Sequence, residues 1–171
     1  LMYADRDTYF GDADFVPVPV AGLLDLGYLD QRAKLIGPKA AANVIAGVPK
    51  GAVRTSPDQT LEPAGTTHFI VRDARGNVVS MTTTVESLFG SGRAVGGFFL
   101  NNQLTDFSFT AIDEAGRPVA NAVAGGKRPR SSMSPAIVLR KADGAFVAAV
   151  LARSRADAAR RRRLVLRHGA D

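Results

Sequence analysis

The segment TTHFIVRDARGNVVSMTTTV, residues 66–85, carries the most regular pattern in the chain. Two runs rich in Val, Ile and Thr, at 68–72 and 78–85, flank the turn-forming residues 73–77. β-Branched residues favour strands, whereas Asp, Gly and Asn favour tight turns. The segment therefore predicts a β-hairpin that begins at a pair of threonines, the first of which is Thr66.

Shorter strands are predicted after this hairpin. Residues 98–103, 134–139 and 145–150 are largely apolar runs bounded by glycine-rich or polar turns. The first strand of the hairpin also contains His68. We expect this histidine to be structural and to give polar cover on the outer face of the strand, whereas Thr66 is a candidate for chemistry.

The first 50 residues predict helices. A helical pattern follows Asp25, and residues 39–46 predict a second short helix after the break at Gly37-Pro38. The apolar positions near one face of the first helix are Leu26, Leu29, Ala33 and Ile36. Short strands after a helical start indicate the α+β class. Residues 47–65 have linker composition, with three prolines and three glycines.

Composition excludes several kinds of function. The chain has 171 residues, 46% of them hydrophobic and 22% charged, which is typical of a globular protein. It has no cysteine for disulfides or thiolate chemistry, and its two histidines are too few for a histidine-based metal site. No apolar run is long enough to span a bilayer. Because the chain begins with Leu1, we expect it to be a fragment of a longer protein. The sequence leaves three locations open for the full-length protein: periplasmic, extracellular or cytoplasmic.

The net charge of +6 is concentrated at the C-terminus. Residues 152–171 contain seven arginines and two aspartates, a net charge of +5, which leaves about +1 for the rest. A solvated basic tail and an arginine-rich arm for nucleic acid are two interpretations of residues 151–171. We favour a third, that these residues are translated out of frame. The nearly neutral body argues against a nucleic-acid partner.

Thr66 follows a glycine at the end of the linker, and this position suits a nucleophile. A threonine at a chain terminus can attack an acyl carbon with its hydroxyl while its own α-amine takes the proton. That amine has a pKa of about 8, so part of it is unprotonated near neutrality. Cleavage between Gly65 and Thr66 would expose it. The alternative is an ordinary threonine at the start of a strand.

Several motifs, taken together, carry a family resemblance. TTHFIVRDARGN, TTTVESLFGSG, FFLNNQLTDFSF and KRPRSSMSP occur in an order and spacing that resemble the γ-glutamyltransferases, which are N-terminal nucleophile hydrolases. The resemblance runs from about residue 3 to about residue 150. It implies part of a four-layer α/β/β/α fold. It also implies that residues 1–65 end a large subunit and residues 66–150 begin a small, catalytic subunit.

The resemblance assigns a role to each site residue. Thr66 would be the nucleophile of both autocleavage and catalysis, and Thr84 would hydrogen-bond its hydroxyl. The resemblance implies that five residues bind the amino and carboxylate ends of a γ-glutamyl substrate: Glu86, Gln103, Asp106, Ser131 and Ser132. Hydrogen-bond acceptors would bind the amino end, and donors would bind the carboxylate. Many family members have asparagine where this chain has Glu86, and others have glutamate. No metal or organic cofactor is implied.

One family motif is missing. The resemblance predicts GSPGGS after residue 150, with two glycines that supply oxyanion-hole N–H groups, but the sequence there is LARSRADAARRRR. Two hypotheses follow. The chain is either part of an enzyme that hydrolyses or transfers γ-glutamyl groups of glutathione and related compounds, or a catalytically inactive remnant or binding protein that keeps part of the fold.

Overall fold

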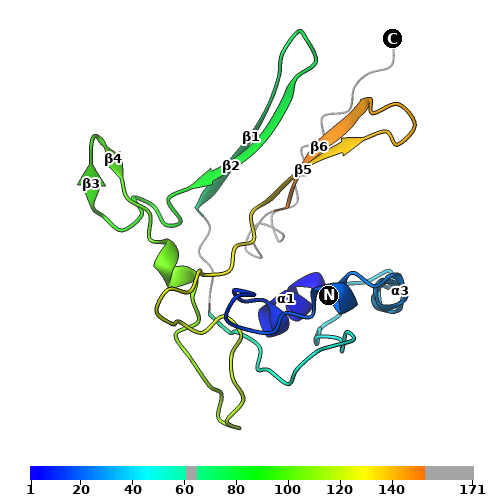
Figure 1. Cartoon of the computed structure of the whole chain (residues 1–171), viewed down its shortest axis with the longest axis vertical. Helices are drawn as coiled ribbons and strands as arrows, with labels where there is room; N and C mark the ends of the chain where they lie inside the picture. Colours follow the sequence, from blue (N-terminus) through cyan, green and yellow to red (C-terminus); the bar gives the residue numbers. More distant parts are fainter. Residues whose placement is uncertain (61–64, 153–171) are drawn as a thin grey trace. The chain divides into compact units, whose positions relative to one another are not determined.

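A computed structural model describes residues 1–60 and 65–152, with the backbone alone at 151 and 152. The predictions for the tail after residue 152 lie outside the described residues. The chain forms two compact units (Figure 1), and each is built from two separate segments. The first unit contains described residues 1–60 and 104–130, and the second contains 65–103 and 131–152.

The first unit begins with the helices α1 (Met2–Tyr9), α2 (Val20–Leu23) and α3 (Leu26–Ala33). The predicted helix after Asp25 is confirmed as α3, but it ends at Ala33, before Ile36. The Asp25 side chain caps it by accepting a hydrogen bond from the Tyr28 N–H at 2.9 Å. The apolar face of α3 is exposed, with Leu26 at 77% exposure. The buried side chains of α3 are Tyr28 and Arg32.

The predicted helix over residues 39–46 is wrong, since this segment is irregular. The end of this segment and the residue after it form hydrogen bonds with side chains of α1 and α3. Arg32 Nη2 donates to the Ile45 carbonyl at 2.9 Å, and the Gly47 N–H donates to Asp5 Oδ1 at 2.8 Å. Backbone groups need partners, and here distant side chains supply them in place of a helical ladder.

The interior of the first unit is unusually polar. Its buried hydrophobic side chains include Tyr9, Tyr28, Phe107 and Val119. They are accompanied by a larger set of buried polar and charged residues, among them Asp5, Arg6, Asp7, Asp12, Arg32, Ser56, Asp58, Ser108, Asn121 and Arg130. Buried charges are tolerated only when they are paired. The stability of this unit therefore depends on specific polar contacts.

The described part of the second unit consists of antiparallel hairpins. The strands β1 (Thr66–Arg72) and β2 (Val78–Thr84) form the predicted first hairpin, which is confirmed. Its turn is closed by the Asp73 carboxylate, which accepts the N–H groups of Arg75 and Asn77, both at 2.9 Å. Gly76 adopts φ +87° there, a conformation that glycine takes without a steric penalty.

The later strands follow the sequence prediction less evenly. β5 (Ser134–Leu139) and β6 (Phe146–Ala152) confirm the strands predicted over 134–139 and 145–150; they pair with each other, and β2 contacts both. The strand predicted over residues 98–103 is shorter than expected: β4 (Phe98–Phe99) pairs with β3 (Ala94–Val95). A 3₁₀ helix, η1 (Gln103–Asp106), occupies the polar end of that run.

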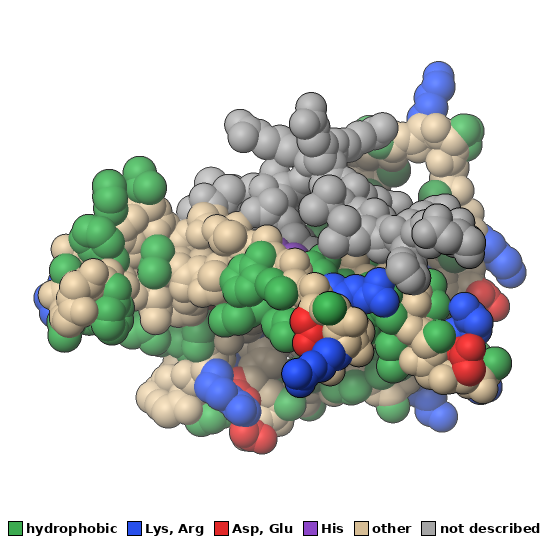
Figure 2. Space-filling view, turned by 90° about the horizontal axis from the view of Figure 1, so that it is seen from above, with side chains coloured by type: hydrophobic (Ala, Val, Ile, Leu, Met, Phe, Trp, Pro, Cys, Tyr) green, Lys and Arg blue, Asp and Glu red, His purple; other side chains and the backbone are tan. Residues whose placement is uncertain are grey.

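Helices and antiparallel strands together confirm the α+β class, whereas the four-layer arrangement stays a prediction. Many apolar side chains are exposed, and Figure 2 shows them on one face of the molecule. Phe69 and Met81, which pair across the first hairpin, are among the exposed ones. Among the residues that the structure describes, no helix is long and apolar enough to cross a membrane.

Candidate active site

The first hairpin places the two predicted catalytic threonines opposite each other. In its register Thr66, the first residue of β1, pairs with Thr84, the last residue of β2. Both are half-buried and belong to the same face of the hairpin, while Thr67 is exposed on the other face. Directly opposed residues in an antiparallel pair have Cβ atoms about 5 Å apart. Hairpin register alone therefore brings the threonines together.

The Thr84 hydroxyl contacts the peptide bond at which cleavage is predicted. It donates a hydrogen bond to the Gly65 carbonyl oxygen at 3.2 Å and accepts one from the Glu86 N–H at 2.7 Å. The second contact fixes the orientation of the hydroxyl. Its proton is consequently directed at the carbonyl that Thr66 would attack.

The backbone around this contact is tightly constrained. Glu86 is buried, with 5% exposure, and adopts φ +75°, a conformation that is uncommon outside glycine. A Cβ atom at Gly65 would collide with the Glu86 carbonyl oxygen. Strained residues of this kind are concentrated at functional sites. Glycine before Thr66 is thus required by the close approach of two backbone segments.

Gln103 is held near the same loop by a neighbouring asparagine. The Ser87 N–H donates to Asn102 Oδ1 at 2.9 Å, and Asn102 Nδ2 donates to Ser87 Oγ at 3.1 Å. The Gln103 N–H in turn donates to the side chain of Asn101 at 3.0 Å. Sequence reasoning gave Asn102 no part in the site. The motif LNNQ was the available signal, because its two asparagines follow an apolar run that predicts a strand.

The remaining predicted site residues are Asp106, Ser131 and Ser132, which belong to other segments of the chain. Asp106 belongs to the first compact unit, where its carbonyl oxygen accepts a hydrogen bond from Asn121 Nδ2 at 2.6 Å. Ser131 and Ser132 immediately precede β5 in the second unit. Ser131 Oγ accepts the N–H of Met133 at 3.1 Å, which forms a local turn.

His68 was expected on the outer face of its strand, and that expectation is wrong. It is half-buried on the face that carries Thr66, two residues earlier. Its Nδ1 lies 2.9 Å from Thr82 Oγ1, and its Nε2 lies 3.3 Å from Ser80 Oγ. The imidazole therefore bridges β1 to β2 on the threonine face. A structural role is consistent with these contacts.

A metal centre finds no support in the described part of the chain, where no group of three or more His, Asp or Glu residues is arranged to bind an ion. The described contacts place the hydroxyl-bearing residue Thr66 directly after a carbonyl that accepts a hydrogen bond from Thr84. Such an arrangement suits acyl transfer, since the donor stabilises the oxygen that gains negative charge.

Known proteins resemble the chain over most of its length. A sequence model of the family described as Gamma-glutamyltranspeptidase matches residues 1–152. The Glutathione hydrolase proenzyme of Pseudomonas aeruginosa is 46% identical over 146 residues, 81% of this chain and 24% of that protein. The Glutathione hydrolase proenzyme of Bacillus subtilis is 44% identical over 151 residues, 82% of this chain and 24% of that protein.

A solved structure is also similar. The gamma-glutamyltranspeptidase from Pseudomonas nitroreducens complexed with L-DON has 43% sequence identity and a TM-score of 0.41, and the match covers 49% of this chain and 46% of that chain. The chain spans about a quarter of the length of the curated relatives that it matches. On the match to residues 1–152 and the identity to these proenzymes, the chain belongs to the gamma-glutamyltranspeptidase family.

Proposed function

We propose that Thr66 first cleaves its own chain and then acts as the nucleophile of γ-glutamyl hydrolysis or transfer. The observation that carries this proposal is the contact between the Thr84 hydroxyl and the Gly65 carbonyl, at 3.2 Å, beside the Thr66–Thr84 register pair. This contact supports the proposal, because Thr66 would supply the nucleophile and Thr84 the oxyanion donor at one peptide bond. The proenzyme names of the relatives support the same interpretation.

The proposed cleavage has two steps. The Thr66 hydroxyl attacks the Gly65 carbonyl carbon, and the bond from that carbon to the Thr66 nitrogen breaks, which gives an ester and a free amine. Water then hydrolyses the ester to a Gly65 carboxylate and restores the hydroxyl. Thr84 would stabilise the oxyanion of the first step.

In the processed protein the freed Thr66 amine would act as the base for its own hydroxyl. The hydroxyl would attack the γ-glutamyl carbonyl of glutathione or a related compound, and the resulting acyl-enzyme would be resolved by water or an amino acid. Our proposal for substrate binding keeps the residues implied by the family: Glu86, Gln103, Asp106, Ser131 and Ser132. Carboxylates suit the substrate ammonium group, and hydroxyls suit its carboxylate.

Two larger features belong to the same proposal. Residues up to Gly65 would end a large subunit, and residues from Thr66 would begin a small subunit of one precursor. The hairpins of the second unit would belong to a four-layer α/β/β/α fold. A crystal structure of the processed protein tests both statements.

Intact-mass measurement of the purified chain tests the cleavage. We expect two products that separate between Gly65 and Thr66, and none from a Thr66→Ala variant. Thr67→Ala is the matched control, because Thr67 is the exposed neighbour on the opposite face. A chain that stays uncut and releases no product from a γ-glutamyl anilide refutes the proposal and favours the inactive remnant.

A further inference from the structure

The first compact unit combines segments from both sides of the proposed cut. Residues 1–60 precede Gly65, and residues 104–130 follow it. Ser56 forms a parallel bridge with Val119, and its N–H donates to the Pro118 carbonyl oxygen at 2.9 Å. Cleavage at Gly65 would therefore leave this unit composed of two chains.

Ion pairs between the two segments have a consistent direction of charge. Arg130 Nη2 lies 3.1 Å from Asp58 Oδ2 and 3.3 Å from Asp7 Oδ1. Arg128 pairs with Asp12 and Asp14. In these four pairs the carboxylate belongs to the segment before the cut, and the guanidinium belongs to the segment after it.

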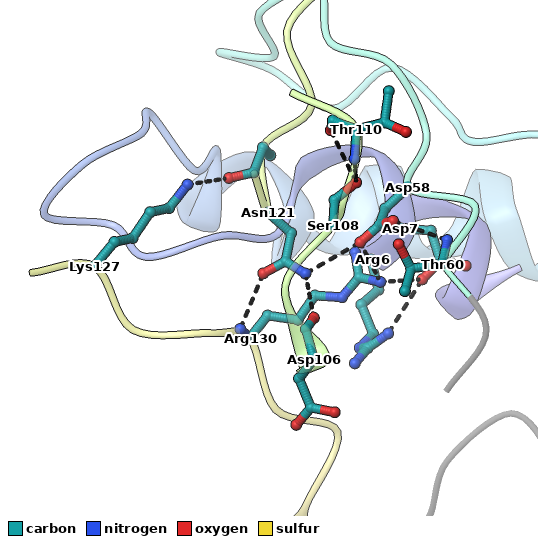
Figure 3. A network of polar contacts seen from close by, with 11 residues as sticks. Arg6, Asp7, Asp58, Thr60, Asp106, Ser108, Thr110, Asn121, Lys127 and Arg130 are labelled. Carbon is teal, nitrogen blue, oxygen red and sulfur yellow. Dashed lines mark hydrogen bonds and ion pairs between the residues drawn. The ribbon is translucent and has the colours of Figure 1, made fainter. Parts of the chain in front are cut away.

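Figure 3 shows Arg130 in a cluster with Asp7, Asp58 and Asn121. The side chain of Arg130 is 4% exposed, and that of Asp58 is fully buried. Asn121 joins the cluster: its Nδ2 donates to Asp58 Oδ2 at 3.1 Å, and its Oδ1 accepts the Arg130 N–H at 3.0 Å. Burial raises the pKa of Asp58, but hydrogen bonds from Thr60 and Asn121 and the charge of Arg130 outweigh it, so the pKa is lowered overall. Asp58 is thus ionised at neutral pH.

The Arg128 pair adds a second point of attachment. Arg128 donates to Asp12 through its backbone N–H at 2.9 Å and through Nε at 2.8 Å. The Asp12 side chain is only 2% exposed, whereas that of Arg128 is 70% exposed. Charge-assisted contacts of this kind are about twice as strong as neutral hydrogen bonds.

We infer that these pairs form the interface that keeps the two halves of the chain associated after cleavage. Arginines of residues 128–130 bind the carboxylates Asp7, Asp12 and Asp58 of the other half. The contacts exist in the uncut chain, so the interface is assembled before the cut. Removal of one member of a buried ion pair leaves the other charge unpaired, and this is strongly unfavourable.

The experiment makes the cut independently of Thr66. The full chain carries Thr66→Ala, which prevents self-cleavage, and a recognition sequence for an added protease in place of residues 61–64. After digestion, size-exclusion chromatography and native mass spectrometry measure whether the two pieces stay together. The inference rests on the proposed cut, but failure of Thr66 to cleave would not affect this measurement.

We expect the digested chain to remain one complex, and Arg130→Met to raise its dissociation constant by at least about a hundredfold, or ~2.8 kcal/mol at 1.4 kcal/mol per tenfold. Arg117→Met is the matched control, because the partner of Arg117, Asp113, lies on the same side of the cut. Thermal unfolding of the uncut Arg130→Met chain reports whether that variant folds.

Arg128→Met is the second variant, because the Arg128 side chain is largely exposed and its backbone N–H still donates to Asp12 after the substitution. Thermal unfolding of the uncut variant checks that it folds. We expect it to weaken the complex about tenfold. Separation of the pieces when all of the arginines are intact would overturn the inference. Complexes of Arg130→Met and Arg128→Met that are as tight as that of Arg117→Met would overturn it as well.

Discussion

Replacement of Thr84 by valine tests the cleavage chemistry most directly. Valine keeps the β-branched shape of threonine but removes the hydroxyl, and therefore both of its contacts: the hydrogen bond to the Gly65 carbonyl and the one from the Glu86 N–H. The first contact acts on the reacting carbonyl, and the second positions the hydroxyl. Cleavage rate and stability should therefore change by different amounts.

The expected size follows from the geometry. Loss of one oxyanion donor slows acyl transfer by about a hundred- to a thousandfold, or ~2.7–4 kcal/mol. The 3.2 Å separation between Thr84 Oγ1 and the Gly65 oxygen is longer than the usual 2.5–3.0 Å of a hydroxyl donor, so we expect the lower end, about a hundredfold. Loss of the acceptor for the Glu86 N–H should lower the free energy of unfolding by about 1 kcal/mol.

The assay follows the uncut chain over time by intact mass, with thermal or denaturant unfolding measured on the same samples. Thr84→Ser restores the hydroxyl and should recover most of the rate. Thr83→Val changes the neighbouring threonine, which is exposed on the opposite face, and should leave the rate unchanged. The reasoning is refuted if Thr84→Val cleaves at the wild-type rate, or if Thr84→Ser is as slow as Thr84→Val.

Three further changes test other parts of the structure. Gly65→Ala should block cleavage and lower the free energy of unfolding by about 1–3 kcal/mol, because its Cβ would collide with the Glu86 carbonyl; mass spectrometry and denaturant unfolding measure both, and a normally processed variant would contradict the model of the site. Asn121→Leu should lower the free energy of unfolding by about 3 kcal/mol, because Asp58, the Asp106 carbonyl and the Arg130 N–H each lose a hydrogen-bond partner. A decrease below about 1 kcal/mol in denaturant unfolding would show that these groups find other partners. Hydrogen bonds and the charge of Arg128 hold the pKa of Asp12 well below its ordinary value. A pKa that is lower in the folded state than in the unfolded state stabilises the fold above the unfolded pKa of about 4, and this stabilisation is lost as the pH falls toward the folded pKa. The thermal unfolding midpoint should therefore decrease as the pH is lowered below about 4. It should decrease less steeply in Asp12→Asn.

Local patterns predicted the elements whose hydrogen bonds are local. The first hairpin pairs residues at most 18 positions apart, from Thr66 with Thr84 to Arg72 with Val78, and its turn is closed by Asp73 within five residues. Alternating β-branched residues and a turn signal were sufficient there. The helix prediction for residues 39–46 was wrong for the opposite reason. The Ile45 carbonyl and the Gly47 N–H bond to Arg32 and Asp5, which are too distant in the sequence for a local pattern to reveal.

The predicted site divides in the same way. Thr66, Thr84 and Glu86 lie together because hairpin register and one short loop connect them. Asp106 belongs to another compact unit, so no strand pattern could relate it to Thr66. Its role in substrate binding, like the roles of the predicted serines, stays a prediction from the family resemblance.

By itself, the sequence determined the first hairpin, the positions of β5 and β6, and that a threonine after glycine begins the first strand. It also determined the family, through motifs whose order and spacing are linear properties. Only the tertiary structure brought Arg128 to Asp12, 116 residues away, and Asn121 to Asp58, 63 residues away. The physical reason is that a buried ion pair forms only where folding removes both partners from water, and no spacing along the chain encodes that environment.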